Sequence, residues 1–103
     1  MTFEVLRLIQ ADHPSLPGHF PGAPLVPGVV ILDEVVAALN EWQRNSQLSG
    51  IRNVKFLAPL KPEQLFTISL SVTSKNNSEV SFCCRLEQRV IVEGRLEIAW
   101  GAR

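Results

Sequence analysis

Two side chains near the N-terminus are suited to acid–base chemistry. His19 lies in residues 13–28, which hold five of the seven prolines and three of the six glycines of this 103-residue chain. Proline fixes φ and restricts the residue before it, so this segment should be stiff and should hold the imidazole in place. Asp33 follows fourteen residues after His19. Because histidine titrates near neutral pH, His19 is suited to be a general base, and Asp33 could supply the acid.

A third group that could act on a substrate is the backbone N–H of Gly28. Pro27 and Gly28 directly precede a long apolar run, and proline suits the first turn of a helix because it has no N–H. We therefore expect a helix to begin near Gly28. The free N–H groups at a helix start favour a developing negative charge, and glycine has no side chain to block the approach.

The residues after Gly28 predict one helix that runs to about Arg44. Apolar side chains cover nearly every face of its first three turns, which is typical of a buried helix. They would desolvate Asp33 and raise its pKa, whereas the positive helix end would lower it, so the direction of the net shift stays open. Asp33, or equally Glu34, could also merely complement the helix dipole. The apolar residues are Val29, Val30, Ile31, Leu32, Val35, Val36, Ala37, Ala38, Leu39 and Trp42.

The rest of the chain predicts strands. In residues 65–73, apolar and polar side chains alternate, which is typical of an antiparallel strand with one buried face. Gly94 is interpreted as a bulge in the last strand. We expect a single α+β domain over residues 1–103, in which an antiparallel sheet packs around one helix. The predicted strands span residues 3–10, 51–57, 65–73, 80–86 and 90–100.

Composition narrows the function classes. Ten basic and ten acidic side chains cancel, which argues against a nucleic-acid-binding protein. No segment is apolar over the length of a membrane span, and the first ten residues lack the pattern of a signal peptide, so we expect a cytoplasmic protein. Cys83 and Cys84 are adjacent, and neighbours on a strand point to opposite faces, so a mutual disulfide is not expected. Without a CxxC motif or a nearby histidine cluster, neither is a metal site.

The segment around His19 resembles a known signature. Residues 18–29 read GHFPGAPLVPGV, which resembles the GHFPxxPxxPGV motif of the hotdog-fold 3-hydroxyacyl-(acyl-carrier-protein) dehydratases. That family has a Glu or Asp fourteen residues after the histidine, the position of Asp33 here. Residues 54–65, VKFLAPLKPEQL, resemble the family's KFxxPxxPGDxL pattern. Among the members, the chain looks most like the compact dehydratases of aryl-polyene-type biosynthetic clusters.

The resemblance implies a fold, a reaction and residue roles. The hotdog fold is a curved antiparallel sheet wrapped around one long buried central helix. The reaction is dehydration of a 3-hydroxyacyl thioester, carried on acyl carrier protein, to the trans-2-enoyl thioester in fatty-acid or polyene biosynthesis, and it needs no cofactor. The implied catalytic residues are His19 and Asp33, with the Gly28 N–H as oxyanion donor. In the family the histidine and the acid of one site come from different subunits, so a homodimer or a heterodimer with a second hotdog subunit is implied.

Other residues have weaker assignments. We expect Phe20, Pro27 and Phe56 to line a substrate channel, with a core position as the alternative for Phe20. His13 is the rival imidazole. Three cations could meet an acidic carrier protein, or could be ordinary solvated charges. They are Arg52, Lys55 and Lys61.

The chain departs from the family pattern at two positions, and two other functions stay open. Ala37 stands where the family often has Gln, four residues after the acid, and Glu63 stands at the glycine of the PGD turn. One alternative is a hotdog acyl thioesterase, although the GHFP histidine argues against it. The other is a supporting subunit of a heterodimeric dehydratase, which is motivated by Ala37 and by the lack of the short helix and strand with which the usual members begin.

Overall fold

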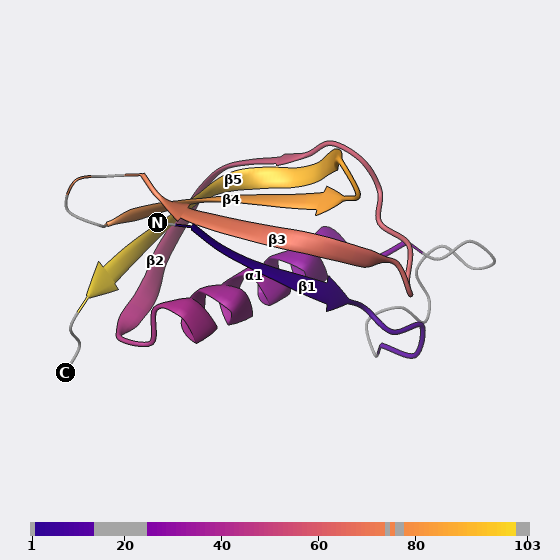
Figure 1. The fold of residues 1–103 in the computed structure, drawn as a ribbon, viewed down its shortest axis with the longest axis horizontal. Coiled ribbons are helices and arrows are strands. Elements are labelled where there is room, and N and C mark those ends of the chain that lie inside the picture. Colours follow the sequence, from indigo (N-terminus) through magenta and orange to yellow (C-terminus); the bar gives the residue numbers. More distant parts are fainter. Residues whose placement is uncertain (1, 14–24, 74, 76–77, 101–103) are drawn as a thin grey trace.

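In the part of the chain that the structure describes, five antiparallel strands form one sheet, and one helix lies against one face of it (Figure 1). The computed structural model describes residues 2–13, 25–73, 75 and 78–100. This arrangement confirms the predicted α+β fold class. The elements are β1 (Thr2–Leu8), α1 (Gly28–Trp42), β2 (Ser46–Phe56), β3 (Leu65–Val72), β4 (Glu79–Leu86) and β5 (Arg89–Trp100).

The strand order is β1-β3-β4-β5-β2, so β1 and β2 form the two edges. The alternation predicted for residues 65–73 holds: Phe66, Ile68 and Leu70 are buried, and the polar residues between them point to the other face. Neighbouring strands keep this register, with Leu70 opposite Phe82 on β4. The sheet therefore has one apolar face toward the helix and one polar face, as period-two alternation requires.

Helix α1 is buried on one side only. Its buried residues, Val30, Ile31, Val35, Ala38 and Leu39, face the sheet. The expectation of burial on every face does not hold for the single chain, because Val29 is 64% exposed and Asp33, Ala37 and Asn40 are also exposed. These four recur at helical spacing and form one stripe opposite the buried side.

Two predicted boundaries are wrong in the same region. The helix ends at Trp42 rather than Arg44, because the N–H and the hydroxyl of Ser46 both donate to the carbonyl of Gln43, at 3.1 and 2.7 Å. The next strand starts at once, at Ser46, five residues before the predicted start. As an edge strand with mostly exposed side chains, β2 lacks the apolar alternation that would have predicted it.

Gly94 lies opposite a bulge, but the extra residue is on β2 and not on the last strand: two β2 residues between Arg52 and Lys55 face Gly94 in the β2–β5 pairing. Toward β4, Gly94 pairs in register with Phe82. A Cβ atom at Gly94 would lie 2.9 Å from the Phe82 ring and 3.1 Å from the Cα atom of Val54. The glycine is needed because a ring and a neighbouring backbone approach it closely.

Among the residues that the structure describes, no helix has the length and hydrophobicity to cross a membrane.

Candidate active site

An apolar pocket of about 490 Å³ lies at the start of α1. It brings together three of the residues predicted to face substrate, namely Pro27, Gly28 and Phe56. One wall is the end of the loop that leads into the helix, and the other is the segment that follows β2. The lining residues are Leu25, Val26, Pro27, Gly28, Ile31, Phe56, Leu57, Ala58, Pro59 and Leu60.

Among the residues that the structure describes, no side chain caps the helix start at this pocket. Pro27 is the N-cap residue, in an extended conformation with φ −61° and ψ 145°, and no acidic residue lies in the first turn. The first N–H groups of a helix have no partner within the helix, and the helix dipole adds partial positive charge there. The Gly28 end of α1 is therefore suited to stabilise a negative charge that develops in the pocket.

Phe56 shapes the pocket next to Gly28. Its ring lies so close that a Cβ atom on Gly28 would be 2.6 Å from Cε1 and 2.7 Å from Cζ. The Phe56 side chain is otherwise open, with 55% of the residue exposed. A glycine is thus required at the helix start for the ring to lie over the backbone, which agrees with the predicted roles of both residues without testing them.

Asp33 does not line this pocket. It lies on the exposed stripe of α1, next to Val29 and Ala37, so the neighbours expected to desolvate it point elsewhere. Ile31 and Val35 are buried against the sheet, because successive helical residues are rotated by about 100°. In the single chain, the carboxylate therefore faces the side of α1 that the protein's own sheet leaves uncovered.

His19 and Phe20 lie outside the described residues, but the two ends of their loop are held by one segment. On the entering side, the Glu63 N–H donates to the Ile9 carbonyl at 2.8 Å, and the Ala11 N–H donates to Oε2 of Glu63 at 2.7 Å. On the leaving side, the Val26 N–H donates to the Leu60 carbonyl at 2.8 Å. The stretch after β2 thus anchors both ends of the loop.

Glu63 has a structural role that its sequence position did not indicate. Its φ is +67°, in the left-handed region where glycine is preferred. This is the position at which the resembling PGD turn has glycine. Glu63 thus adopts the left-handed conformation although it is not glycine. Its carboxylate accepts a hydrogen bond from the Ala11 N–H, which a glycine could not do.

The rival imidazole occupies different surroundings. The backbone N–H of His13 donates to the Gln10 carbonyl at 3.0 Å, and His13 lines a separate pocket of about 430 Å³ with Asp12 and Glu34. Within the described ranges, that pocket and the pocket at Gly28 have no lining residue in common.

The three candidate cations differ in their partners. Arg52 forms an ion pair with Glu97, which accounts for its charge within the sheet. Lys55 and Lys61 are exposed, and no ion pair is found for either within the described part of the chain. They directly flank the pocket wall at residues 56–60.

A family model and a curated relative that match this chain are both dehydratases. The family model ApeI-like, described as ApeI dehydratase, matches residues 2–95. The chain is 32% identical to a 3-hydroxyacyl-(acyl-carrier-protein) dehydratase FabZ from Chlamydia abortus, covering 88% of this chain and 67% of that protein. It thus spans about two thirds of the length of this curated relative.

Solved structures share the fold. The dehydratase heterocomplex ApeI:P from Xenorhabdus doucetiae contains a chain that matches with a TM-score of 0.83 at 23% identity, covering 95% of this chain and 87% of that one. A probable thioesterase from Bartonella henselae matches with a TM-score of 0.73 at 13% identity, covering 96% and 88%. At these identities the structures establish the hotdog fold, which hosts both chemistries.

Proposed function

Because this chain belongs to the ApeI-like dehydratase family, we propose that it removes water from a 3-hydroxyacyl thioester on acyl carrier protein and forms the trans-2-enoyl thioester. Membership confirms the family predicted from the two sequence motifs, and with it the enzyme class, a dehydratase. We further propose which residues perform the reaction, that the substrate is held on acyl carrier protein, and that the protein is cytoplasmic.

The proposed chemistry divides among three groups. His19 removes a proton from C2 of the acyl chain, and Asp33 protonates the C3 hydroxyl, which leaves as water as the C2–C3 double bond forms. The Gly28 N–H donates to the thioester oxygen, which gains negative charge as the C2 proton leaves. Each residue has a chemical type that suits its step, and no cofactor is needed.

The single observation that carries the proposal is the apolar pocket at the uncapped start of α1. An acyl chain requires apolar walls, which Ile31, Phe56 and Leu60 supply. A thioester carbonyl requires a donor at one end of these walls, which Gly28 supplies. The pocket thus has both properties that the substrate needs.

The exposed position of Asp33 favours a site completed by a second hotdog subunit. Asp33 lies beside an uncovered Val29, which is 64% exposed, so the stripe that carries the acid is also partly apolar. A second subunit over this stripe would cover Val29 and bring its own loop histidine toward Asp33. The similar Xenorhabdus chain belongs to a heterocomplex, so the second subunit could also be a different hotdog chain.

The carrier protein would approach the pocket between Lys55 and Lys61. Both lysines are exposed and flank the wall at residues 56–60. Acyl carrier protein is acidic and holds its substrate on a phosphate-linked arm, so two exposed cations beside the pocket wall are suited to steer it.

The test is turnover of a panel of carrier-bound 3-hydroxyacyl substrates, followed by mass spectrometry. We expect the wild-type protein to remove one water from the substrate. We expect the rate to be lower by on the order of 10²- to 10⁴-fold in His19→Ala and in Asp33→Asn. Unchanged turnover in both variants would refute the site assignment. Release of free carrier thiol without enoyl product would favour the thioesterase alternative.

Mixing the two variants tests the shared site. His19→Ala and Asp33→Asn subunits that exchange into mixed dimers would restore one intact site per mixed dimer, or about a quarter of wild-type activity at equal amounts. No recovery, with subunit exchange shown by native mass spectrometry, would place both residues of a site in one subunit. An inert wild-type homodimer that becomes active with a second hotdog chain would favour the supporting-subunit alternative.

A further inference from the structure

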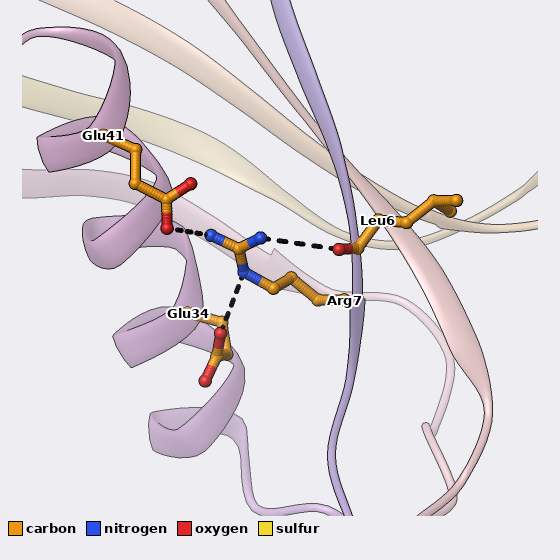
Figure 2. A network of polar contacts seen from close by, with 4 residues as sticks. All are labelled: Leu6, Arg7, Glu34 and Glu41. Carbon is orange, nitrogen blue, oxygen red and sulfur yellow. Dashed lines mark hydrogen bonds and ion pairs between the residues drawn. The ribbon is translucent and has the colours of Figure 1, made fainter.

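One arginine links the edge strand β1 to two carboxylates of α1. Figure 2 shows the Arg7 guanidinium between the strand and the helix, with Glu34 and Glu41 on one side and the Leu6 carbonyl on the other. Its Nε atom lies 3.1 Å from Oε1 of Glu34, Nη2 pairs with Oε2 of Glu41, and Nη1 lies 3.4 Å from the Leu6 carbonyl oxygen. All three nitrogens of the guanidinium therefore have a partner.

The spacing of the two carboxylates makes this contact sensitive to helix rotation. Glu34 and Glu41 are seven residues apart, which is close to two turns, so they lie in line along one side of α1. Asp33 precedes Glu34 and is therefore rotated from it by about 100°. When Arg7 holds Glu34 and Glu41 against β1, Asp33 is directed to the open side of the helix.

Hydrophobic burial favours this side of the helix, because Asp33 and Asn40 lie on the exposed stripe, but it fixes the rotation only coarsely. Apolar residues occupy nearly every face of the first three turns of α1, and burial of apolar area is non-directional. A helix turned so that Val29 and Val36 faced the sheet would still bury aliphatic side chains, but it would carry Asp33 toward the sheet. A paired guanidinium does have direction, because its donors must meet both acids at fixed angles.

The surroundings of Arg7 strengthen the contact. Its side chain is only 20% exposed, and every charged residue within residues 28–42 is an acid: Asp33, Glu34 and Glu41. The hydrogen bond from Arg7 lowers the pKa of Glu41, and the same contact raises the pKa of Arg7. Arg7 on β1 thus supplies the positive charge that pairs with Glu34 and Glu41 of the helix.

We infer that Arg7 is a positioning residue for the dehydration: by pairing with Glu34 and Glu41, it sets the rotation of α1 that directs Asp33 to the open side. This inference rests on the proposed function, in which Asp33 is the acid. Arg7 itself touches no part of the pocket at Gly28. Its effect would therefore reach the reaction through the placement of Asp33.

The test compares Arg7→Met with a matched control, Arg85→Met. Arg85 also pairs with β1, through Glu4 at 3.3 Å, and its side chain is 31% exposed, but Glu4 points to the face of the sheet away from the helix. We expect Arg7→Met to lower kcat about tenfold with KM within about twofold, since a small misplacement of a catalytic group is costly. We expect Arg85→Met to keep wild-type kcat and Arg7→Lys to recover part of the loss.

A double-mutant cycle separates positioning from a general loss of stability. If Arg7 acts through Asp33, then Arg7→Met should lower kcat in the wild-type background but not in the Asp33→Asn background. An equal loss in both backgrounds would overturn the inference, as would wild-type kcat in Arg7→Met. If Arg7→Met does not fold, Glu34→Gln/Glu41→Gln is put through the same cycle. Wild-type protein without dehydratase activity would instead refute the proposed function.

Discussion

The ring of Phe56 lies over the backbone of Gly28, with Cε1 2.6 Å from the position that a Cβ atom would occupy. This contact joins the end of β2 to the start of α1, and it places an apolar wall beside the first N–H groups of the helix. Because 55% of Phe56 is exposed, its ring can turn outward at a small cost in free energy. The contact therefore matters more to the shape of the pocket than to stability.

Replacing Gly28 with alanine tests this distinction. We expect Gly28→Ala to displace the ring and lower kcat/KM about tenfold or more, while the free energy of unfolding changes by less than about 1 kcal/mol, since alanine favours a helix. The double variant Gly28→Ala/Phe56→Ala removes the crowding. If Gly28→Ala lowers activity only through the ring, it should cost no further activity in the Phe56→Ala background. A full additional loss there would mean that the methyl group blocks the substrate itself.

The left-handed backbone at Glu63 gives a second prediction. Glu63→Ala keeps the unfavourable φ of +67° and loses the hydrogen bond to Ala11, whereas Glu63→Gly loses the same bond but relieves the backbone. We expect Glu63→Ala to be less stable than Glu63→Gly by about 1 kcal/mol, measured by urea unfolding. Glu63→Gln, which keeps an oxygen acceptor, should lie close to wild type. Equal stability of the alanine and glycine variants would contradict the role given to the backbone.

The sequence predicts those parts of the fold whose secondary structure is determined by residues close together in the sequence. The alternation in residues 65–73 predicts β3 because side chains on a strand change face at each residue. Pro27 and Gly28 predict the start of α1 because proline suits a first turn. The extent of β2 was missed because an edge strand with exposed side chains carries no such pattern.

The rotation of α1 could not be predicted for a different reason. Apolar residues on nearly every face leave the exact rotation undecided, and contacts with β1, which ends twenty residues before α1 begins, contribute to it. The pairing of Arg7 with Glu34 is one such contact, and the stacking of Phe3 on Trp42, with ring centroids 5.8 Å apart, is another. Neither pair has a local sequence signal, so the exposed position of Asp33 emerges only from the structure.

The adjacent cysteines should react very differently. Both are free, Cys83 is partly exposed, and Cys84 is fully buried. Burial raises the pKa of the Cys84 thiol to about 12, so almost no thiolate forms at pH 8. We expect iodoacetamide at pH 8 to add at most one group to the native protein, on Cys83, and two after unfolding in urea. Alkylation of Cys84 in the native protein, located by peptide mass spectrometry, would contradict this burial.

The pairing of Arg7 with Glu41 gives a pH dependence with a definite sign. The hydrogen bond from Arg7 lowers the pKa of Glu41 from its usual 4.5, so the folded state binds that proton less readily than the unfolded state. Stability from this pair is complete above pH 4.5 and is lost as the pH falls through the lower, folded value. We therefore expect Tm to be higher in wild type than in Glu41→Gln at pH 7, and the difference to shrink below pH 4.5. The Glu4–Arg85 pair is present in both proteins and cancels in this comparison. A difference that stays constant from pH 7 to pH 3, measured by differential scanning calorimetry, would show that the pair contributes no pH-dependent stability.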